Sequence, residues 1–308
     1  MTLEHKRRLA FEYGVVDQLS PLVRRVICEN PSPFTFTGTG TYIVGTGNVA
    51  VVDPGPDAPD HLNAIMMALD PGEAISHILV THTHADHSPG ARWLSKHTGA
   101  PVYASAAAVA TEAAPESSTS SMTEEGTDRL FQPDQLLADG DTLAGDDWVV
   151  SALETPGHCR EHLCFELATE HVMFTGDHIM AWATSVVVAP GGSMTDYLAS
   201  LERVAQRTDI ERLWPTHGPS VDDPQSYVNA LITHRRDRAD QIRALLENGV
   251  GNISEIVPIL YAEYDRNVWF AAAATVHAHL IALVESGEVD IVNDAPVSMG
   301  AEFRLIRP

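Results

Sequence analysis

The chain has 308 residues, of which 19 are lysine or arginine and 42 are aspartate or glutamate, so its formal net charge is −23 at pH 7. This excess of negative charge disfavours tight binding to long nucleic acids and to anionic membranes, because both require clustered cations. The composition, 44% hydrophobic and 20% charged, is that of an ordinary globular protein. At roughly 150 residues per domain, the length predicts two domains, or one large domain with an appendage.

Three features of the sequence bear on its cellular compartment. No run of about 18 consecutive apolar residues is present, so no membrane-spanning helix is expected. The basic residues 6–8 are not followed by an apolar segment, and we therefore expect no secretory signal peptide. The three cysteines, Cys28, Cys159 and Cys164, are odd in number and lack the spacing of a metal-binding finger. This usage fits a reducing cytoplasm.

The first half of the chain predicts strands that alternate with helices. The N-terminal 30 residues show no regular period and predict an irregular lead-in. Residues 39–52 contain two β-rich runs around a Gly-Asn pair, which predicts a hairpin. The next predicted elements are a helix over 60–69, a buried strand over 75–80, a helix over 90–98 and a short strand over 101–103.

A biased segment separates these elements from the next strands. Residues 104–128 are rich in Ala, Ser, Thr and Glu and predict a mobile loop or a loosely packed helix. From 100 to 147 there are ten carboxylates and one cation, which favours a solvated acidic face. A cleft wall that repels anions is the alternative. Further on, the pattern predicts strands over 147–154, 162–168 and 171–175 and a helix over 195–207 that begins at or near Thr195.

After Pro224 the pattern becomes helical. Helices are predicted over 226–247, 253–262 and 268–286, followed by a hairpin from 288–293 and 302–306. Three helices and a hairpin form a small winged-helix-like unit, whereas the preceding order of elements predicts helices outside two β-layers. We therefore predict an α/β (α+β) protein with domains at 1–225 and 226–308.

The most informative segment is an H-x-H-x-D-H motif directly after the predicted strand 75–80. It consists of His82, His84, Asp86 and His87. Residues two apart at a strand end point the same way, so the first two histidines can face one metal ion. The consecutive Asp86 and His87 can turn to a second ion. Imidazoles and carboxylates suit zinc, and manganese or iron is also admissible. The alternative, a histidine-rich surface loop, would produce this motif only by chance.

Three later residues complete a ligand set for two metals. His158 occupies a Thr-Pro-Gly-His turn, Asp177 ends a predicted strand in Thr-Gly-Asp, and His217 lies in Thr-His-Gly. Each is a weak signal by itself. Together with the first motif they supply the number and type of ligands that two metal ions need.

In this order the four motifs resemble the metallo-β-lactamase superfamily over roughly residues 30–220. The resemblance implies an αββα sandwich with a metal site at one edge. It also implies that Asp177 bridges the two ions, a position that is often Cys in one subclass of the lactamases proper. Aspartate here favours the hydrolase, lactonase, glyoxalase II and nuclease branches. The implied ligands are His82, His84 and His158 on one metal, and Asp86, His87 and His217 on the other.

The C-terminal part is similar to a narrower group. A Pro-Thr-His-Gly-Pro run, a long helix that contains His234-Arg235-Arg236, and a winged-helix tail resemble the lactamase-like protein branch. That branch includes a mitochondrial single-strand endoribonuclease. The resemblance therefore implies a second possible chemistry for the same metal site.

Two zinc ions about 3.5–4 Å apart would hold a bridging water and lower its pKa towards about 7. The resulting hydroxide would attack an acyl carbon or a phosphorus atom. Asp86, the predicted catalytic residue, would ligate one ion, orient the hydroxide and pass a proton to the leaving group. We expect a hydrolase of a small acyl substrate: a thioester, lactone, ester or lactam. A metal-dependent phosphodiesterase or single-strand endoribonuclease is the alternative.

A basic stripe on the predicted helix 226–247 is the only local support for that alternative. It consists of Arg235, Arg236, Arg238 and Arg243. The favoured interpretation is a solvated face that pairs with Asp237 and Asp240; the other is a contact for a phosphate or a coenzyme tail. Residues 226–308 carry a net charge of −4. We therefore expect a scaffold, a homodimer contact or a lid here, and no DNA binding.

The remaining candidates are single residues. His178 follows Asp177 and is a candidate support for a metal ligand. His277 and His279 lie two apart on a predicted helix and face different sides, so no metal pair is expected. Aromatic residues from the tail are candidates for the pocket wall: Tyr261, Tyr264 and Trp269.

Overall fold

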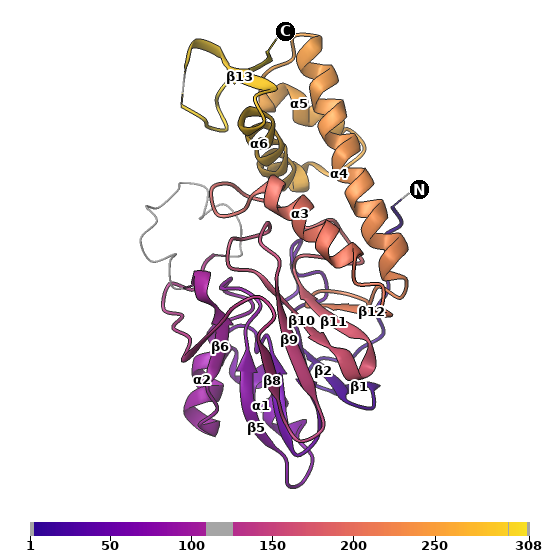
Figure 1. Ribbon diagram of the computed structural model, residues 1–308, viewed down its shortest axis with the longest axis vertical. Coiled ribbons are helices and arrows are strands. Elements are labelled where there is room, and N and C mark those ends of the chain that lie inside the picture. Colours follow the sequence, from indigo (N-terminus) through magenta and orange to yellow (C-terminus); the bar gives the residue numbers. More distant parts are fainter. Residues whose placement is uncertain (1–2, 109–125, 295, 307–308) are drawn as a thin grey trace.

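The computed structural model describes residues 3–108, 126–294 and 296–306. A β-rich body forms the lower part of the molecule, and a smaller helical unit stands on it (Figure 1). The long helix α4 (Pro224–Glu247) runs along the side of both parts. The prediction for 104–128 lies mostly outside the described residues.

Among the described residues, the first sheet contains seven strands in the order β1-β2-β3-β4-β5-β6-β7. Neighbours are antiparallel from β1 to β4 and parallel from β4 to β7. The predicted hairpin 39–52 is confirmed as β3 and β4, and the predicted strand 75–80 as β5. The bounds are β1 Val16–Ser20, β2 Val23–Ile27, β3 Gly40–Val44, β4 Asn48–Val52, β5 Ala74–Leu79, β6 Val102–Ser105 and β7 Gln135–Leu137.

The predicted irregular lead-in is confirmed for residues 3–15 but is wrong for residues 16–27. β1 and β2 form an antiparallel hairpin that turns at Pro21, and every residue of β2 is buried. Arg24 and Arg25 interrupt the apolar pattern of β2, which is why the strand is hard to see in the sequence. Both charges are neutralised, because Arg24 makes a two-pronged ion pair with Glu73 at 2.8 and 2.9 Å and Arg25 contacts Asp17 at 3.1 Å.

The second sheet, over the same described ranges, contains five strands in the order β12-β11-β10-β9-β8. All of its pairs are antiparallel except the parallel pair of β11 and β12. The two sheets pack face to face around a core that includes Leu79, Phe165 and Phe174. The bounds are β8 Thr142–Ala144, β9 Val149–Glu154, β10 Leu163–Leu167, β11 Val172–Gly176 and β12 Arg212–Pro215.

Helices cover the outer faces of both sheets. α1 (Pro59–Met67) and α2 (Pro89–Thr98) pack on the first sheet, and α3 (Met194–Ala205) packs with the first half of α4 on the second. The predicted αββα sandwich is therefore confirmed. Ser193 begins α3, because its hydroxyl accepts the backbone N–H of Asp196. The predicted start at or near Thr195 is close to this cap.

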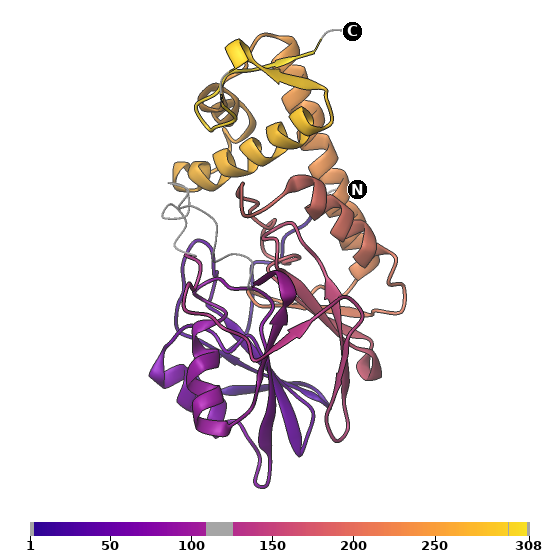
Figure 2. The ribbon, with the colours of Figure 1, turned by 60° about the vertical axis from the view of Figure 1, so that its left-hand side comes forward.

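The helical unit, which lies at the top of Figure 2, has its own apolar core. It is built from the second half of α4, α5 (Ile253–Leu260), α6 (Trp269–Glu285), β13 (Val289–Ile291) and β14 (Phe303–Leu305). Short 3-10 turns accompany the described elements: η2 (Ala168–Glu170) in the sandwich, and η3 (Arg266–Val268) and η4 (Val292–Asp294) in the unit. Because α4 contributes apolar residues to both cores, the boundary predicted at 225/226 stays a prediction.

One described stretch, residues 266–285, is long and apolar enough to cross a membrane by length and composition, but half of it is buried. This stretch contains α6, whose Val276 and Leu280 pack in the core of the helical unit. A core helix passes the same test, so this is weak support for a membrane span.

Candidate metal centre

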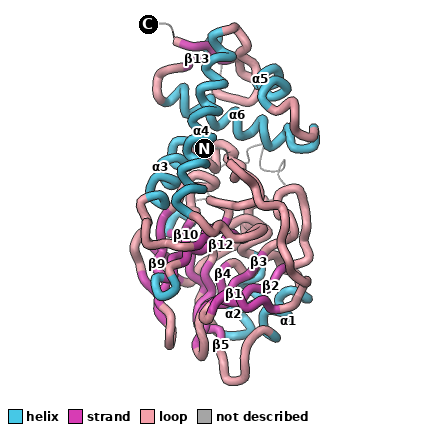
Figure 3. The backbone as a smooth tube through the Cα atoms, turned by 90° about the vertical axis from the view of Figure 1, so that its right-hand side faces the viewer, coloured by secondary structure: helices cyan, strands magenta, loops and turns pink. Residues whose placement is uncertain are grey.

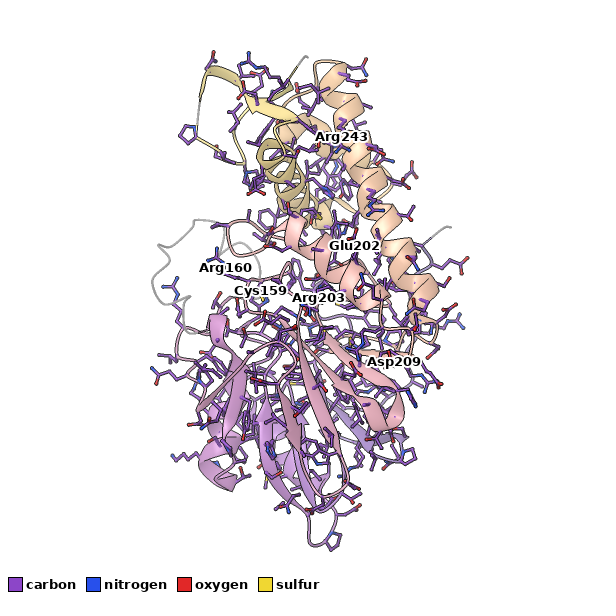
Figure 4. The ribbon with its side chains drawn as sticks, in the orientation of Figure 1. Cys159, Arg160, Glu202, Arg203, Asp209 and Arg243 are labelled. Atoms are coloured by element: carbon purple, nitrogen blue, oxygen red, sulfur yellow. The ribbon has the colours of Figure 1, made fainter. Side chains whose placement is uncertain are left out.

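The residues of the predicted site come from loops that follow strand ends. β5 ends at Leu79 just before the H-x-H-x-D-H motif, and Asp177 follows the last residue of β11. Figure 3 shows such loops gathered at the sandwich edge that faces the helices of the unit. Cys159 and Arg160, the chain neighbours of His158, lie at that edge (Figure 4). Rigid strand ends aim these side chains, while the loops allow them to crowd together.

The structure brings His82, His84 and His158 into one group. Nδ1 of His84 lies 2.9 Å from Nε2 of His82 and 3.1 Å from Nε2 of His158. His158 is oriented by its other nitrogen, Nδ1, which lies 2.7 Å from the carbonyl oxygen of Val186. Three imidazole nitrogens that converge in this way could hold one metal ion.

A second group consists of Asp86, His87 and His217. One carboxylate oxygen of Asp86 lies 3.0 Å from Nε2 of His217 and 3.4 Å from Nε2 of His87. Asp177 lies between the two groups: its oxygens are 3.4 Å from His217 and 3.7 Å from His87, and it also groups with His82. All seven predicted ligands thus lie together at this edge.

Several buried polar atoms of the second group and of Asp177 have no hydrogen-bond partner. They are both carboxylate oxygens of Asp86, Oδ1 of Asp177, and Nε2 of His87 and His217. Buried polar atoms are normally satisfied, because an unsatisfied one costs about 1–3 kcal/mol. These unpaired nitrogen and oxygen atoms lie close together, and such a set of ligand atoms fits a bound transition metal ion.

The pKa values of the histidines also indicate that positive charge is favoured beside the two carboxylates. Burial alone would lower the pKa of His217, but the carboxylates of Asp177 and Asp86 outweigh it and raise that pKa to about 9. The same carboxylates raise the pKa of His87 well above its usual range. In the first group, burial and then the neighbouring imidazole of His158 lower the pKa of His84 to about 3. A neutral His84 is ready to donate a lone pair to a metal.

Asp53 supports the site and is the main residue that sequence reasoning missed. Its buried carboxylate accepts hydrogen bonds from the backbone N–H and hydroxyl of Thr81, both at 2.8 Å, and from the hydroxyl of Thr216 at 2.7 Å. It also lies 2.9 Å from Nδ1 of His87. A carboxylate behind a ligating histidine fixes the ring and the tautomer. The only sequence signal was an aspartate at a strand end before a Pro-Gly turn.

His162 is a second missed residue. Its ring accepts the backbone N–H of Asp177 at 3.2 Å and contacts the hydroxyl of Thr155 at 2.9 Å, so it fixes the backbone at Asp177. His178 was the residue expected in that role. It is fully buried beside Tyr197, and neither of its ring nitrogens has a hydrogen-bond partner.

The interpretation of the basic stripe as a solvated face is wrong for two of its members. Arg235 is 2% exposed and Arg238 is 8% exposed. It holds for the other two, because Arg236 pairs with Glu202 at 2.6 Å and Arg243 with Asp240 at 2.7 Å. Figure 4 shows Glu202 on α3 beside α4, and Arg243 near the far end of α4. No pair with Asp237 is found among the described residues.

The other single-residue predictions have mixed outcomes. Tyr261 and Tyr264 line a cleft that also contains His158 and Asp177, whereas Trp269 is not among its lining residues and donates its indole N–H to the carbonyl of Tyr261. His277 and His279 are both buried, and neither belongs to a metal-type cluster of the described residues. All three cysteines are buried and free.

This fold and this set of side chains define a class of protein. Residues 35–217 match the family model of the metallo-beta-lactamase superfamily, and residues 253–295 match that of the beta-lactamase associated winged helix domain. The chain therefore belongs to the metallo-β-lactamase superfamily and carries a winged helix domain at its C-terminal end.

Individual relatives agree with this assignment. A lactamase-like protein of Pestalotiopsis microspora is 33% identical over 67% of this chain and 57% of its own length. A protein of a Cryptosporiopsis species named atrochrysone carboxyl ACP thioesterase is 31% identical over 75% of this chain and 65% of its own length. The chain thus matches about three fifths of these two relatives. A beta-lactamase domain protein from Burkholderia ambifaria shares the fold with a TM-score of 0.78, at 19% identity over 99% of this chain and 97% of its own.

Proposed function

We propose that this protein is a dinuclear zinc hydrolase of small acyl substrates, of the thioester, ester, lactone or lactam type. The observation that carries the proposal is the pair of converging donor groups beside a cleft, with Asp177 grouped with one histidine of each, His82 and His87. Membership of the superfamily and a relative named as a thioesterase support the hydrolase, and they favour a thioester among the four classes.

The proposed ligands divide as the donor groups do. His82, His84 and His158 would hold one ion; Asp86, His87 and His217 would hold the other; and Asp177 would touch both. Three neutral imidazoles in the first group suit zinc, although manganese or iron would accept the same donors. When bound, the ions supply Lewis-acid activation of a water molecule and of the acyl carbonyl.

The protein residues then have separate tasks. Neither carboxylate oxygen of Asp86 has a hydrogen-bond partner, so one can bind a metal while the other orients the water and accepts its proton. Asp53 and His162 hold His87 and Asp177 in place through the contacts described above. The cleft provides the walls that position the substrate.

An RNA-cleaving function has less support. A phosphate track needs cations that face solvent, but the exposed Arg236 and the half-buried Arg243 are engaged by Glu202, Asp240 and Glu288. Turnover of a polyanion should fall steeply with salt, whereas hydrolysis of an uncharged lactone should hardly change.

The test is a matched assay of the zinc-loaded protein. Thioesters, lactones and single-stranded RNA are offered to the wild type, to Asp86→Ala and to the control Asp57→Ala, which changes an exposed carboxylate of a nearby loop. We expect acyl turnover that Asp86→Ala abolishes and Asp57→Ala leaves intact. Turnover of RNA alone would overturn the proposal.

We further propose a cytoplasmic location, since Cys28, Cys159 and Cys164 are buried thiols without disulfides. The homodimer remains a prediction, which sedimentation analysis of the full chain would check.

A further inference from the structure

A cleft of about 240 Å³ lies between the metal-site edge of the sandwich and the helical unit. His158 and Asp177 belong to its sandwich wall, and Arg235 and Arg238 on α4 belong to the facing wall. The same space therefore borders both the candidate metal centre and the two buried arginines of the basic stripe.

Arg235 is tied to the loop that orients the metal site. Its guanidinium donates a hydrogen bond to the carbonyl oxygen of Ser185 and lies 5.1 Å over the ring of Tyr197. The Ser185 hydroxyl is in turn 3.4 Å from Nδ1 of His158. Nε of Arg235 is buried without a hydrogen-bond partner.

Arg238 lies one helical turn further along the same face of α4. It donates to the carbonyl oxygen of Leu260 at 3.2 Å, and its guanidinium lies 4.4 Å over the ring of Tyr261. Its Nε is also buried without a partner. The contact with Tyr261 and the carbonyl oxygen of Leu260 hold the guanidinium in place, but neither neutralises its positive charge.

No carboxylate of the described residues lies within ion-pair distance of either arginine. The surrounding groups reflect this uncompensated charge. Burial, and then Arg235 and Arg238, lower the pKa of His234 to about 4 and that of His279 to about 3. Arg7 adds a third cation to the lining. In a chain with a net charge of −23, this cleft wall is locally positive.

Buried charges without a counter-ion are costly, so they are normally paired with one. A planar guanidinium matches the two oxygens of a carboxylate or a phosphate. The same cleft is also lined by apolar and aromatic side chains such as Phe34, Met180 and Trp182. These side chains suit an uncharged, apolar segment of a ligand better than a second charged group.

We propose that Arg235 and Arg238 bind an oxyanion of the substrate, a carboxylate or a phosphate, that an apolar spacer separates from the scissile acyl carbon. This inference rests on the proposed function and specifies its substrate class: an acyl thioester or ester with an anionic end. The anion has two possible sources, a carboxylate on the acyl chain or a phosphate on the leaving group.

A binding experiment tests the anion site without turnover. Calorimetry with the zinc-loaded full chain compares adipate with monomethyl adipate, which both keep one carboxylate for a metal but differ in the second. We expect adipate to bind at least about tenfold more tightly, as one charge-assisted hydrogen bond implies. The difference should vanish in Arg238→Gln and persist in Arg236→Gln, the exposed neighbour on the same helix. Inorganic phosphate serves as a further probe with the same two variants.

A kinetic experiment then separates the two sources. The acyl side is tested with the thioesters of adipate and of monomethyl adipate, which carry the same leaving group. The leaving group is tested by comparing a coenzyme A thioester with the N-acetylcysteamine thioester of the same acyl chain. In each pair, the wild type and Arg238→Gln are compared by the kcat/KM ratio of the anionic to the uncharged substrate. If Arg238→Gln removes this preference in the adipate pair, the anion is the carboxylate of the acyl chain. If it does so in the coenzyme A pair, the anion is the phosphate of the leaving group. Arg238→Met, which keeps an unbranched side chain but removes the charge, replaces Arg238→Gln if that variant binds less zinc or unfolds at lower temperature.

The inference is overturned if the wild type binds adipate no more tightly than monomethyl adipate, or if Arg238→Gln leaves the affinities for adipate and phosphate unchanged. If no acyl compound is hydrolysed while the Arg238-dependent binding holds, the proposed hydrolase fails and the anion site stands.

Discussion

Replacement of Asp53 by asparagine should weaken metal binding without touching a proposed ligand. One oxygen of Asp53 accepts three contacts, from Thr81, Thr216 and His87, and the other accepts only the backbone N–H of Thr81. The amide that Asp53→Asn introduces would therefore place its NH₂ group against that single N–H. One hydrogen bond to a charged acceptor is lost, at a cost of about 1.5–3 kcal/mol in unfolding free energy.

The same substitution removes the negative charge behind His87. Loss of such a partner reduces metal affinity by about 10–100-fold. Backbone strain does not contribute, because Asp53 has a φ of 49° and asparagine tolerates this left-handed region nearly as well as aspartate. The effect therefore isolates the charge and the hydrogen bond.

Two measurements check this prediction. Zinc affinity is obtained by competition with a chelator, and the free energy of unfolding by denaturant titration. Asp57→Asn is the matched control, since it makes the same chemical change on an exposed residue. Zinc affinity in Asp53→Asn equal to that of the wild type at both sites would refute the role of Asp53.

Three further outcomes follow from the site. Asp177→Ala should lose at least one metal and lower turnover by more than about 100-fold, since loss of an outer partner alone costs up to about that much; full metal occupancy in this variant would contradict the bridging role. Because the pKa of His217 is raised to about 9 without metal, its stabilising contribution in the metal-free protein is complete below about 6.5 and is lost as the pH rises through about 9. Zinc affinity should instead rise with pH, because His217 must lose its proton to bind the metal. Unfolding of the metal-free and the zinc-loaded protein, measured as a function of pH, checks both trends. Gly157→Ala would place a Cβ 2.3 Å from the Cα of Tyr197, at a φ of 145°; it should destabilise the fold by about 1–3 kcal/mol and displace His158, and a variant with unchanged stability and zinc content would argue against this close approach.

Local patterns of the sequence determined much of this protein. The H-x-H-x-D-H motif needs only a strand end and a turn to aim its side chains, and both are encoded within a few residues. The helices at 60–69, 90–98, 195–207 and 226–247 were predictable for the same reason, because their apolar period is local. The order of the predicted elements indicated two β-layers covered by helices and a winged-helix-like unit, and the family resemblance implied the αββα sandwich. The family models confirm the superfamily and the winged helix domain.

Only the tertiary structure decided which polar residues are buried and what they face. The partners of Asp53 lie 28, 34 and 163 residues away in sequence, so no local pattern distinguishes it from a turn aspartate. Arg24 belongs to a buried strand because Glu73 neutralises it. Arg235 and Arg238 share a helix with the exposed Arg236, and helical spacing alone does not say which face meets a neighbour. The packing of α4 against the sandwich edge makes that choice, because contacts between distant segments, unlike helical periods, are not written in adjacent residues.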